Sequence, residues 1–465
     1  AIPNEQRDRR PTMILVNFRR CAIHRQCRRA AKTDISRRKR RIDNPFSSLA
    51  FHNEFHPVVL ATTTPPSPPL IPPRAQWRIS KNADRFSSSG SSGGDCDDSH
   101  PTPLQAPAGI VARDGGQSPS SSFFIPQKKL HGVDGRVKKR VLVLCTGGTL
   151  TMAPDSRRND ALHPVEGVLT KYMSEMKELE EEGMPEVVTH EYVPLLDSSD
   201  LGPTEWAVIA SDIHANYLQY DGFVVLMGTD TMAYTATALS FMLENLNKPV
   251  VFTGSQIPLT QPHNDARRNL IMALIFASRD TINEVTIFFH DRLLRACRAS
   301  KVNTSHLHAF DTPNMDPLAK VGVTIEENVN LALPPARGAL RLHTAMETRV
   351  MSLRLVPGFD DRMIRRMIEA STRSDLRALV LQLYGMGNLP SVKDSIIRTL
   401  EEAREKGVLV VASTQCHTGS VMMGHYATGQ ALIDAGVVSA SDMTLEAISC
   451  KVGYLFGRGD LTAEE

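Results

Sequence analysis

The sequence predicts an α/β protein in which a larger, doubly wound parallel-sheet N-terminal domain is followed by a smaller α/β C-terminal domain. Three observations support this fold class. Short apolar runs of strand length alternate with stretches of helix length, an order typical of parallel sheets with helices on both faces. Polar, glycine-containing segments follow several of these runs directly. A long segment rich in proline, serine and glycine precedes the first run, and its composition predicts disorder.

Residues 1–134 are expected to form a disordered, low-complexity extension. Residues 1–42 are rich in arginine and lysine, and residues 61–126 contain a proline-rich and a serine- and glycine-rich stretch. Such a composition buries too little apolar surface to offset the entropy that is lost on ordering. The basic, acid-poor segment from Met13 onward is typical of an organelle transit peptide. A gene-model extension and a nucleic-acid-binding arm are the alternatives, although no known nucleic-acid-binding module is apparent.

The clearest structural unit is a strand, a helix and a second strand. The apolar run 224–227 predicts a buried strand, residues 232–245 a helix, and residues 250–252 the next strand. Ligands of parallel sheets bind beyond the carboxyl ends of the strands, so Thr229 and Asp230 in the first loop are candidate site residues. Capping of the following helix is the alternative role for this polar loop.

An equivalent junction occurs at the first strand of the ordered region. Residues 141–145 form an apolar run, and Thr146-Gly147-Gly148-Thr149 follows immediately. Two glycines at a strand end allow close approach of the backbone to a ligand or to another loop. The full GxGxxG and GxxxxGKS spacings of nucleotide-binding loops are absent. Thr149 is therefore interpreted as a hydroxyl presented at the edge of the crevice.

Further elements follow in the same alternation. Strands are expected over residues 190–194, 285–289, 378–383 and 408–412. Helices are expected over residues 165–182, 206–217, 265–277, 361–370, 392–405, 426–435 and 443–456. Residues 295–301 are interpreted as part of a long polar connection, and residues 320–357 as a linker region.

Together, the loops that follow the strands carry hydroxyl and carboxylate groups that could take part in catalysis, and the polar connection carries Lys301. The side chains concerned are Thr149, Ser198, Ser199, Asp200, Thr229 and Asp230. A hydroxyl is a weak nucleophile and needs a base, and a lysine can serve when its surroundings favour its neutral form. These residue types are compatible with acyl transfer if the fold brings them together.

Several classes of protein are disfavoured by composition. Seven cysteines occur without CxxC pairs, which predicts neither a zinc site nor a disulfide framework and fits reduced thiols. No apolar run approaches the ~18–20 residues that span a bilayer, so no membrane partner is expected. Five histidines lack the spacing of metal ligands: His163, His190, His306, His308 and His417.

A set of motifs over residues 138–456 resembles the bacterial-type L-asparaginase family, and most closely its cytosolic type I branch. The motifs, in chain order, are TGGT, EYVPLLDSSDL, YDGFVVLMGTDTMAYTATALSFMLENL, KPVVFTGSQIPL, ACRASKV, FDTPN, LYGMGN and YATGQAL. TGGT alone could match by chance, whereas the whole ordered set is specific.

The resemblance implies roles for individual residues. It makes Thr149 the nucleophile, and Thr229, Asp230 and Lys301 the group that handles the proton. The residues it assigns to substrate binding are Ser198, Ser199, Thr229, Asp230 and Asn388, the last offered to the neighbouring site of a dimer. Helix capping for Ser198, a solvated cation for Lys301 and a turn residue for Asn388 are the alternatives.

The resemblance further implies hydrolysis of L-asparagine to L-aspartate and ammonia through a threonine acyl-enzyme, without a metal or an organic cofactor. It implies an N-terminal catalytic domain over 138–330, a C-terminal domain over 350–465, and a homodimer or homotetramer with no nucleic-acid partner. A cytoplasmic location is expected, or a mitochondrion or plastid if the N-terminus is a transit peptide. The alternatives are a glutamine-preferring amidohydrolase, a subunit of a tRNA-dependent amidotransferase, or a catalytically inactive amino-acid-binding protein.

One position departs from the family pattern. Many members carry a tyrosine on the lid that follows the nucleophile, and Leu162 stands near that position here. A leucine has no hydroxyl and can neither donate a hydrogen bond to Thr149 nor accept one.

Overall fold

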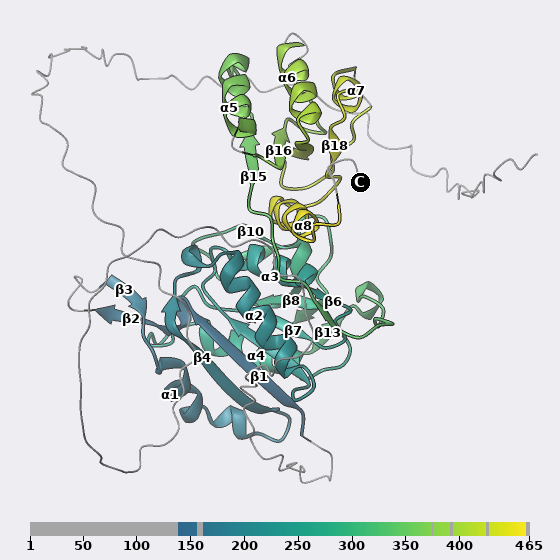
Figure 1. Ribbon diagram of the computed structural model, residues 1–465. Helices are drawn as coiled ribbons and strands as arrows, with labels where there is room; N and C mark the ends of the chain where they lie inside the picture. Colours follow the sequence, from purple (N-terminus) through teal and green to yellow (C-terminus); the bar gives the residue numbers. More distant parts are fainter. Residues whose placement is uncertain (1–137, 156–160, 374, 391–393, 425–426, 462–465) are drawn as a thin grey trace, which may run out of the picture. The chain divides into compact units, whose positions relative to one another are not determined.

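The computed structural model describes residues 138–155, 161–373, 375–390, 394–424 and 427–461. Its larger sheet has eight strands in the order β13-β12-β9-β8-β7-β5-β1-β4. Figure 1 labels β1, β4, β7, β8 and β13 of this sheet. Neighbours from β4 to β8 run parallel, and β9, β12 and β13 add an antiparallel edge. The strands are β1 (Arg140–Gly147), β4 (Glu186–Leu196), β5 (Gly222–Leu226), β7 (Val250–Thr253), β8 (Val285–Phe289), β9 (Arg292–Arg295), β12 (Ala319–Val321) and β13 (Ile325–Glu327).

Helices cover both faces of this sheet. Alternate residues of a strand point to opposite faces, so Leu142 and Leu144 of β1 join one core while Val141 and Val143 join the other. The first core includes α2 (Pro203–Asn216) and α3 (Met232–Met242). The second includes α1 (Val168–Glu175) and α4 (Ala266–Ala277). The predicted doubly wound sheet is confirmed for the described residues.

The smaller sheet contains four parallel strands in the order β15-β16-β17-β18. They are β15 (Val350–Arg354), β16 (Ala378–Leu383), β17 (Leu409–Thr414) and β18 (Val438–Ser439). Apolar residues of α5 (Asp361–Arg373), α6 (Asp394–Glu405) and α7 (Ala427–Asp434) pack in one core. α8 (Leu445–Gly457) packs on Ala378, Val380 and Val411. The rings of Phe241 in α3 and Tyr454 in α8 also stack, with centroids 5.6 Å apart.

Several expected boundaries were wrong. The helix predicted to reach residue 245 ends at Met242, because residues 243–244 form β6 (Leu243–Glu244) and pair with β14 (Arg341–Leu342). The helix expected over 165–182 is α1 followed by a 3-10 helix (Lys177–Glu180), since Met176 between them is extended. The strand expected over 190–194 extends from Glu186 to Leu196.

Short strands within the regions interpreted as connections were missed. The polar segment 295–301 ends in β10 (Ser300–Lys301), which pairs with β11 (Phe310–Asp311). The region 320–357 contains β14 and β15, and β15 opens the smaller sheet. β15 has only partly buried and exposed residues, so it lacks the apolar run that marks a buried strand.

Two further observations concern the described residues alone. None of the described helices combines the length and the apolar character needed to cross a membrane. The described cysteines Cys145, Cys297, Cys416 and Cys450 carry free thiols. The extension predicted over residues 1–134 lies outside the described part of the chain.

Candidate active site

The candidate residues follow neighbouring strands of the larger sheet. Thr149 begins a 3-10 helix (Thr149–Thr151) after β1, Ser198 begins another (Ser198–Asp200) after β4, and Thr229 lies between β5 and α3. β4, β1 and β5 are adjacent and parallel, so these loops share one edge of the sheet. This is the edge at which parallel sheets bind ligands.

Two glycines bring the three loops into contact. A Cβ atom on Gly148 would lie 2.1 Å from the backbone nitrogen of Gly228. A Cβ atom on Gly228 would lie 2.7 Å from Oγ of Ser198. In addition, the Thr231 hydroxyl donates a hydrogen bond of 2.6 Å to the Ser198 carbonyl. The missing side chains of the two glycines therefore allow the loops of Thr149, Thr229 and Ser198 to touch.

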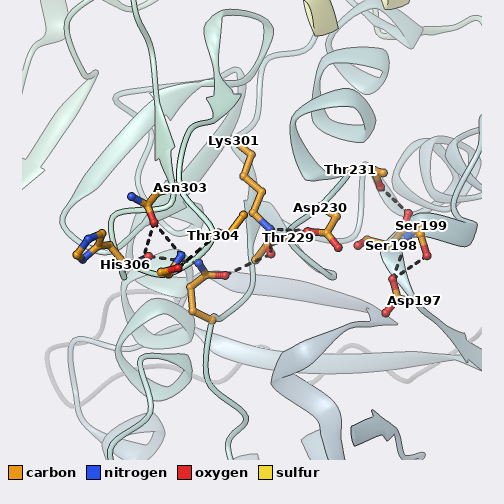
Figure 2. A network of polar contacts seen from close by, with 12 residues as sticks. Asp197, Ser198, Ser199, Thr229, Asp230, Thr231, Lys301, Asn303, Thr304 and His306 are labelled. Carbon is orange, nitrogen blue, oxygen red and sulfur yellow. Dashed lines mark hydrogen bonds and ion pairs between the residues drawn. The ribbon is translucent and has the colours of Figure 1, made fainter. Parts of the chain in front are cut away.

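Lys301 joins Thr229 to Asp230. Its Nζ lies 2.8 Å from Oγ1 of Thr229 and 2.5 Å from Oδ1 of Asp230 (Figure 2). Thr229 is 6% exposed and the Lys301 side chain 15%, whereas the Asp230 side chain is 68% exposed. The ammonium group is thus held beside a buried hydroxyl, while the carboxylate of Asp230 remains accessible. Lys301 is not a solvated loop cation.

The segment that carries Lys301 is held in place by contacts with α8, with the residue Asp442 before it, and with β11. Oγ of Ser300 donates a 2.6 Å hydrogen bond to the buried carboxylate of Glu446 in α8. Arg298 forms an ion pair with Asp442, and this guanidinium holds the pKa of Asp442 below its ordinary value. Lys301 itself pairs with Phe310 across β10 and β11. Residues far away in the sequence therefore determine where the ammonium group lies.

The alternative capping roles are not found. The side chain of Asp197 caps the 3-10 helix by accepting the Ser199 N–H at 3.0 Å, and it also accepts the Ser199 hydroxyl at 3.0 Å. Ser198 is 2% exposed and lies against Gly228. The residue before α3 is Thr231, and it makes no side-chain capping bond. Asp230 contacts Lys301 instead of capping α3.

Thr149 and Asn388 form no hydrogen bond to Thr229, Asp230 or Lys301 among the described residues. Among the described residues, the Thr149 hydroxyl has no hydrogen-bond partner, although the Gly148–Gly228 contact places its loop beside that of Thr229. Asn388 follows β16, and its backbone bridges to Tyr384. Within the described parts of the same chain, no hydrogen bond joins Asn388 to the other candidate residues. The assignment of Asn388 to a neighbouring site stays a prediction.

Sequence reasoning missed Gln256, which follows β7. Its Oε1 lies 3.4 Å from Oγ1 of Thr229, and its Nε2 donates a 3.2 Å hydrogen bond to the carbonyl of His306. β7 is the neighbour of β5 in the sheet. The signal was present, because the segment Thr253-Gly254-Ser255-Gln256 is another strand end followed by glycine and polar residues.

Leu162 lies in the hairpin that follows Thr149. It belongs to β3 (Ala161–Pro164), pairs with Pro154 of β2 (Met152–Asp155), and is 44% exposed. Over the described residues, no cluster of three or more histidine, cysteine, aspartate or glutamate side chains could hold a metal ion. The functional groups in this site are hydroxyls, a carboxylate, an ammonium group and an amide.

Comparison with known proteins identifies asparaginases as similar in sequence over both sheets. The family profile "Asparaginase, N-terminal" matches residues 140–334, and "Glutaminase/Asparaginase C-terminal domain" matches residues 349–465. L-asparaginase 1 of Escherichia coli K12 is 44% identical over 321 residues, which are 69% of this chain and 93% of that protein.

Two further similarities extend the comparison. The crystal structure of L-asparaginase I from Vibrio cholerae has a TM-score of 0.64 at 41% identity, covering 70% of this chain and 95% of that one. A glutamyl-tRNA(Gln) amidotransferase component of Thermococcus kodakarensis is 32% identical, over 69% of this chain and 72% of that protein. The chain belongs to the asparaginase family.

Proposed function

We propose that the protein hydrolyses L-asparagine to L-aspartate and ammonia through an acyl-enzyme on Thr149. The observation that carries this proposal is the contact of Lys301 with both Thr229 and Asp230, next to the loop of Thr149. A hydroxyl nucleophile needs a group that accepts its proton and returns it. Between a buried hydroxyl and a carboxylate, the amine of Lys301 is suited to take up that proton, to hold it as an ammonium group and to return it. Membership of the asparaginase family supports the choice of substrate.

The reaction proceeds in two balanced steps. In the first, Oγ1 of Thr149 attacks the side-chain amide carbon, its proton passes to the Thr229, Asp230 and Lys301 group, and ammonia leaves with that proton. In the second, water attacks the resulting ester, aspartate is released, and Thr149 recovers its proton. Both steps need a proton carrier that alternates between acceptor and donor, which is general acid–base catalysis.

Substrate binding is assigned to the two polar loops that flank this group. The exposed carboxylate of Asp230 is suited to the α-ammonium of the amino acid, because it is accessible and already lies in a charged environment. Ser198 supplies a hydroxyl on the same edge of the sheet for the α-carboxylate, and Ser199 and Thr229 are assigned to substrate binding beside it. The amino acid is thereby oriented with its side-chain amide toward Thr149.

The test of the function is ammonia release by the purified full-length chain with L-asparagine and L-glutamine in parallel. We expect release from asparagine, with a higher kcat/KM than for glutamine. The reverse preference would favour a glutamine-preferring amidohydrolase. Binding of asparagine without any ammonia release would instead identify an inactive amino-acid-binding protein and contradict the proposal.

The tRNA-dependent amidotransferase is the second candidate. The matched region takes up 93% of the E. coli asparaginase but only 72% of the amidotransferase component. This difference favours the stand-alone hydrolase. Ammonia release that requires aminoacylated tRNA would reverse this preference.

We also propose that residues 138–330 form the catalytic domain and residues 350–465 the C-terminal domain. The larger sheet with its candidate site supports the first assignment, and the four-stranded sheet from β15 to β18 supports the second. Residues 1–134 are proposed to be an extension outside both. We propose a cytoplasmic role in asparagine catabolism, with an organelle as the alternative if the extension is a transit peptide. The similarity to L-asparaginase 1 of E. coli supports the choice of asparagine.

We further propose a homodimer or homotetramer in which Asn388 reaches the neighbouring site. Mixing subunits that carry Thr149→Ala with subunits that carry Asn388→Ala should restore part of the activity, because one site of each heterodimer then holds both native residues. Ammonia assays before and after subunit exchange measure this effect. Full activity of a monomer would contradict the shared site.

Replacement of Leu162 by tyrosine should change kcat by no more than several-fold. The change adds a phenol to the hairpin after Thr149, while Lys301, Thr229 and Asp230 already form their contacts without it. A gain of about a hundredfold, the size that one catalytic proton-transfer group contributes, would show that the missing phenol limits this protein. Steady-state kinetics with asparagine decide between the two outcomes.

A further inference from the structure

Thr231, the residue directly before α3, directs its hydroxyl away from the helix. A threonine at this position usually accepts a backbone N–H of the first helical turn with its side-chain oxygen. Here no such capping bond forms, and the hydroxyl donates a 2.6 Å hydrogen bond to the carbonyl of Ser198, 33 residues away in the sequence. The helix therefore forgoes a stabilising bond, and a neighbouring loop gains one.

The turn that receives this bond has few other ties. The 3-10 helix of residues 198–200 makes its remaining hydrogen bonds within residues 197–201. Among the described residues, the bond from Thr231 is the one hydrogen bond that joins residues 198–200 to another loop. The position of this turn relative to the start of α3 therefore depends on the Thr231 hydroxyl.

Ser198 also packs against the segment that leads to Asp230. A Cβ atom on Gly228 would lie 2.7 Å from Oγ and 2.8 Å from Cβ of Ser198, and Ser198 is 2% exposed. Figure 2 shows the hydrogen bond between Thr231 and Ser198, and Asp230 in the same segment as Thr231. Loss of the Thr231 hydroxyl would thus release Ser198 relative to Asp230.

The head group of an amino acid makes this spacing important. Its α-carboxylate and α-ammonium are attached to one carbon atom, so their separation is fixed. In the reaction proposed above, Ser198 receives the carboxylate and Asp230 the ammonium. Asp230 and Thr231 are consecutive in the chain. One short segment therefore carries the carboxylate that binds the α-ammonium and holds the turn that binds the α-carboxylate.

We propose that Thr231 is a positioning residue for substrate binding: its hydroxyl, bonded to the Ser198 carbonyl, fixes the spacing of Ser198 and Asp230 at which an α-amino acid head group fits both. This inference deepens the proposed function and rests on it. Thr231 itself neither touches the substrate nor carries a proton in the reaction. It acts on the affinity for the head group, which is the same in asparagine and in aspartate.

The test compares Thr231→Val with Thr231→Ser in the full-length chain. Valine removes the hydroxyl at similar size, and serine keeps it. We expect Thr231→Val to raise KM for asparagine about fivefold, the effect of one neutral hydrogen bond, with kcat within twofold of wild type. A contact that is equally strong in the ground state and in the transition state changes KM alone. Thr231→Ser should restore most of the affinity.

A second measurement does not depend on turnover. Isothermal titration calorimetry with L-aspartate, which carries the same head group, should show a similar loss of affinity, about fivefold, in Thr231→Val. In the Ser198→Ala background, the change at Thr231 should have little further effect on either quantity, because the hydroxyl that Thr231 positions is gone.

Thr235→Val provides a matched control. Thr235 lies in the same helix, and its hydroxyl donates a 3.2 Å hydrogen bond to the Thr231 carbonyl. This bond stays within the helix and does not reach Ser198. The control therefore loses a threonine hydroxyl beside Thr231 and should keep the wild-type KM and the wild-type affinity for aspartate.

An unchanged KM in Thr231→Val overturns the inference, and so does a fall in kcat or in melting temperature with KM intact. Failure of serine to restore the affinity, or an equal loss in Thr235→Val or in the Ser198→Ala background, also overturns it. If wild type releases ammonia, these results leave the proposed function standing. Wild type that binds aspartate without releasing ammonia contradicts the function, and calorimetry then decides the inference. Wild type that does neither contradicts both.

Discussion

Replacement of Thr149 by alanine should reduce kcat for asparagine by a factor of about 10² or more, while the melting temperature stays within a few degrees of wild type. The expected loss is that of a nucleophile for which no neighbouring hydroxyl is a substitute. The fold should tolerate the change because Thr149 is only partly buried and its hydroxyl bonds to none of the described residues. Steady-state ammonia release and thermal unfolding measure the two effects.

Thr149→Ser provides the matched variant. It retains a hydroxyl at the same position and should keep a measurable part of the activity that alanine loses. Near wild-type turnover of Thr149→Ala would contradict the assignment of the nucleophile. Equal loss in the serine and alanine variants would show that the methyl group, not the hydroxyl, is what matters at this position.

Replacement of Gly148 by alanine should abolish activity and also destabilise the protein. Gly148 has φ of 85° and ψ of −177°, a conformation that is essentially confined to glycine and costs other residues of order 1–3 kcal/mol. The added Cβ would also meet the backbone of Gly228 at 2.1 Å. Backbone cannot yield as a flexible side chain does, so the loops of Thr149 and Thr229 must separate.

Gly358→Ala separates the effect of backbone strain at positive φ from the effect of the clash between the added Cβ and another loop. Gly358 has a similar φ of 82°, but nothing lies within 4 Å of an added Cβ. This control should lower the free energy of unfolding by about 1 kcal/mol without loss of activity. Denaturant unfolding and ammonia assays on both variants test the expectation. Full activity in Gly148→Ala would contradict the contact between the two loops as the basis of the site.

Much of the fold could be predicted because the central strands are buried on both faces. Every residue of β5, from Gly222 to Leu226, is buried, and the mainly apolar strands β7 and β8 are buried over their whole length as well. Such runs stand out in a sequence. β15 and β10 could not be found in this way, since their residues are partly exposed and their pairing depends on distant partners. Short strands of this kind are determined by tertiary contacts more than by local composition.

The candidate site was predictable to the extent that its residues follow strands. Thr149, Ser198 and Thr229 were found because parallel strands deliver their carboxyl ends to one edge. For Lys301 the residue chemistry suggested a role as a base, but no position beside Thr229 and Asp230 could be read from the sequence. Its position depends on Ser300, Glu446 and the pairing of β10 with β11, which join segments distant in the sequence. Gln256 was overlooked because an amide carries no charge and its contact with Thr229 is determined by the fold.

In the proposed reaction, the aspartyl group is held for a time as an ester on Thr149. The most direct measurement is rapid acid quenching of the full-length protein during turnover of asparagine, followed by proteolysis and mass spectrometry of the peptide that contains residues 146–149. We expect a fraction of this peptide to carry an added aspartyl group on Thr149, and none in the Thr149→Ala variant. An aspartyl group on a different residue, or turnover by Thr149→Ala at the wild-type rate, would contradict the account.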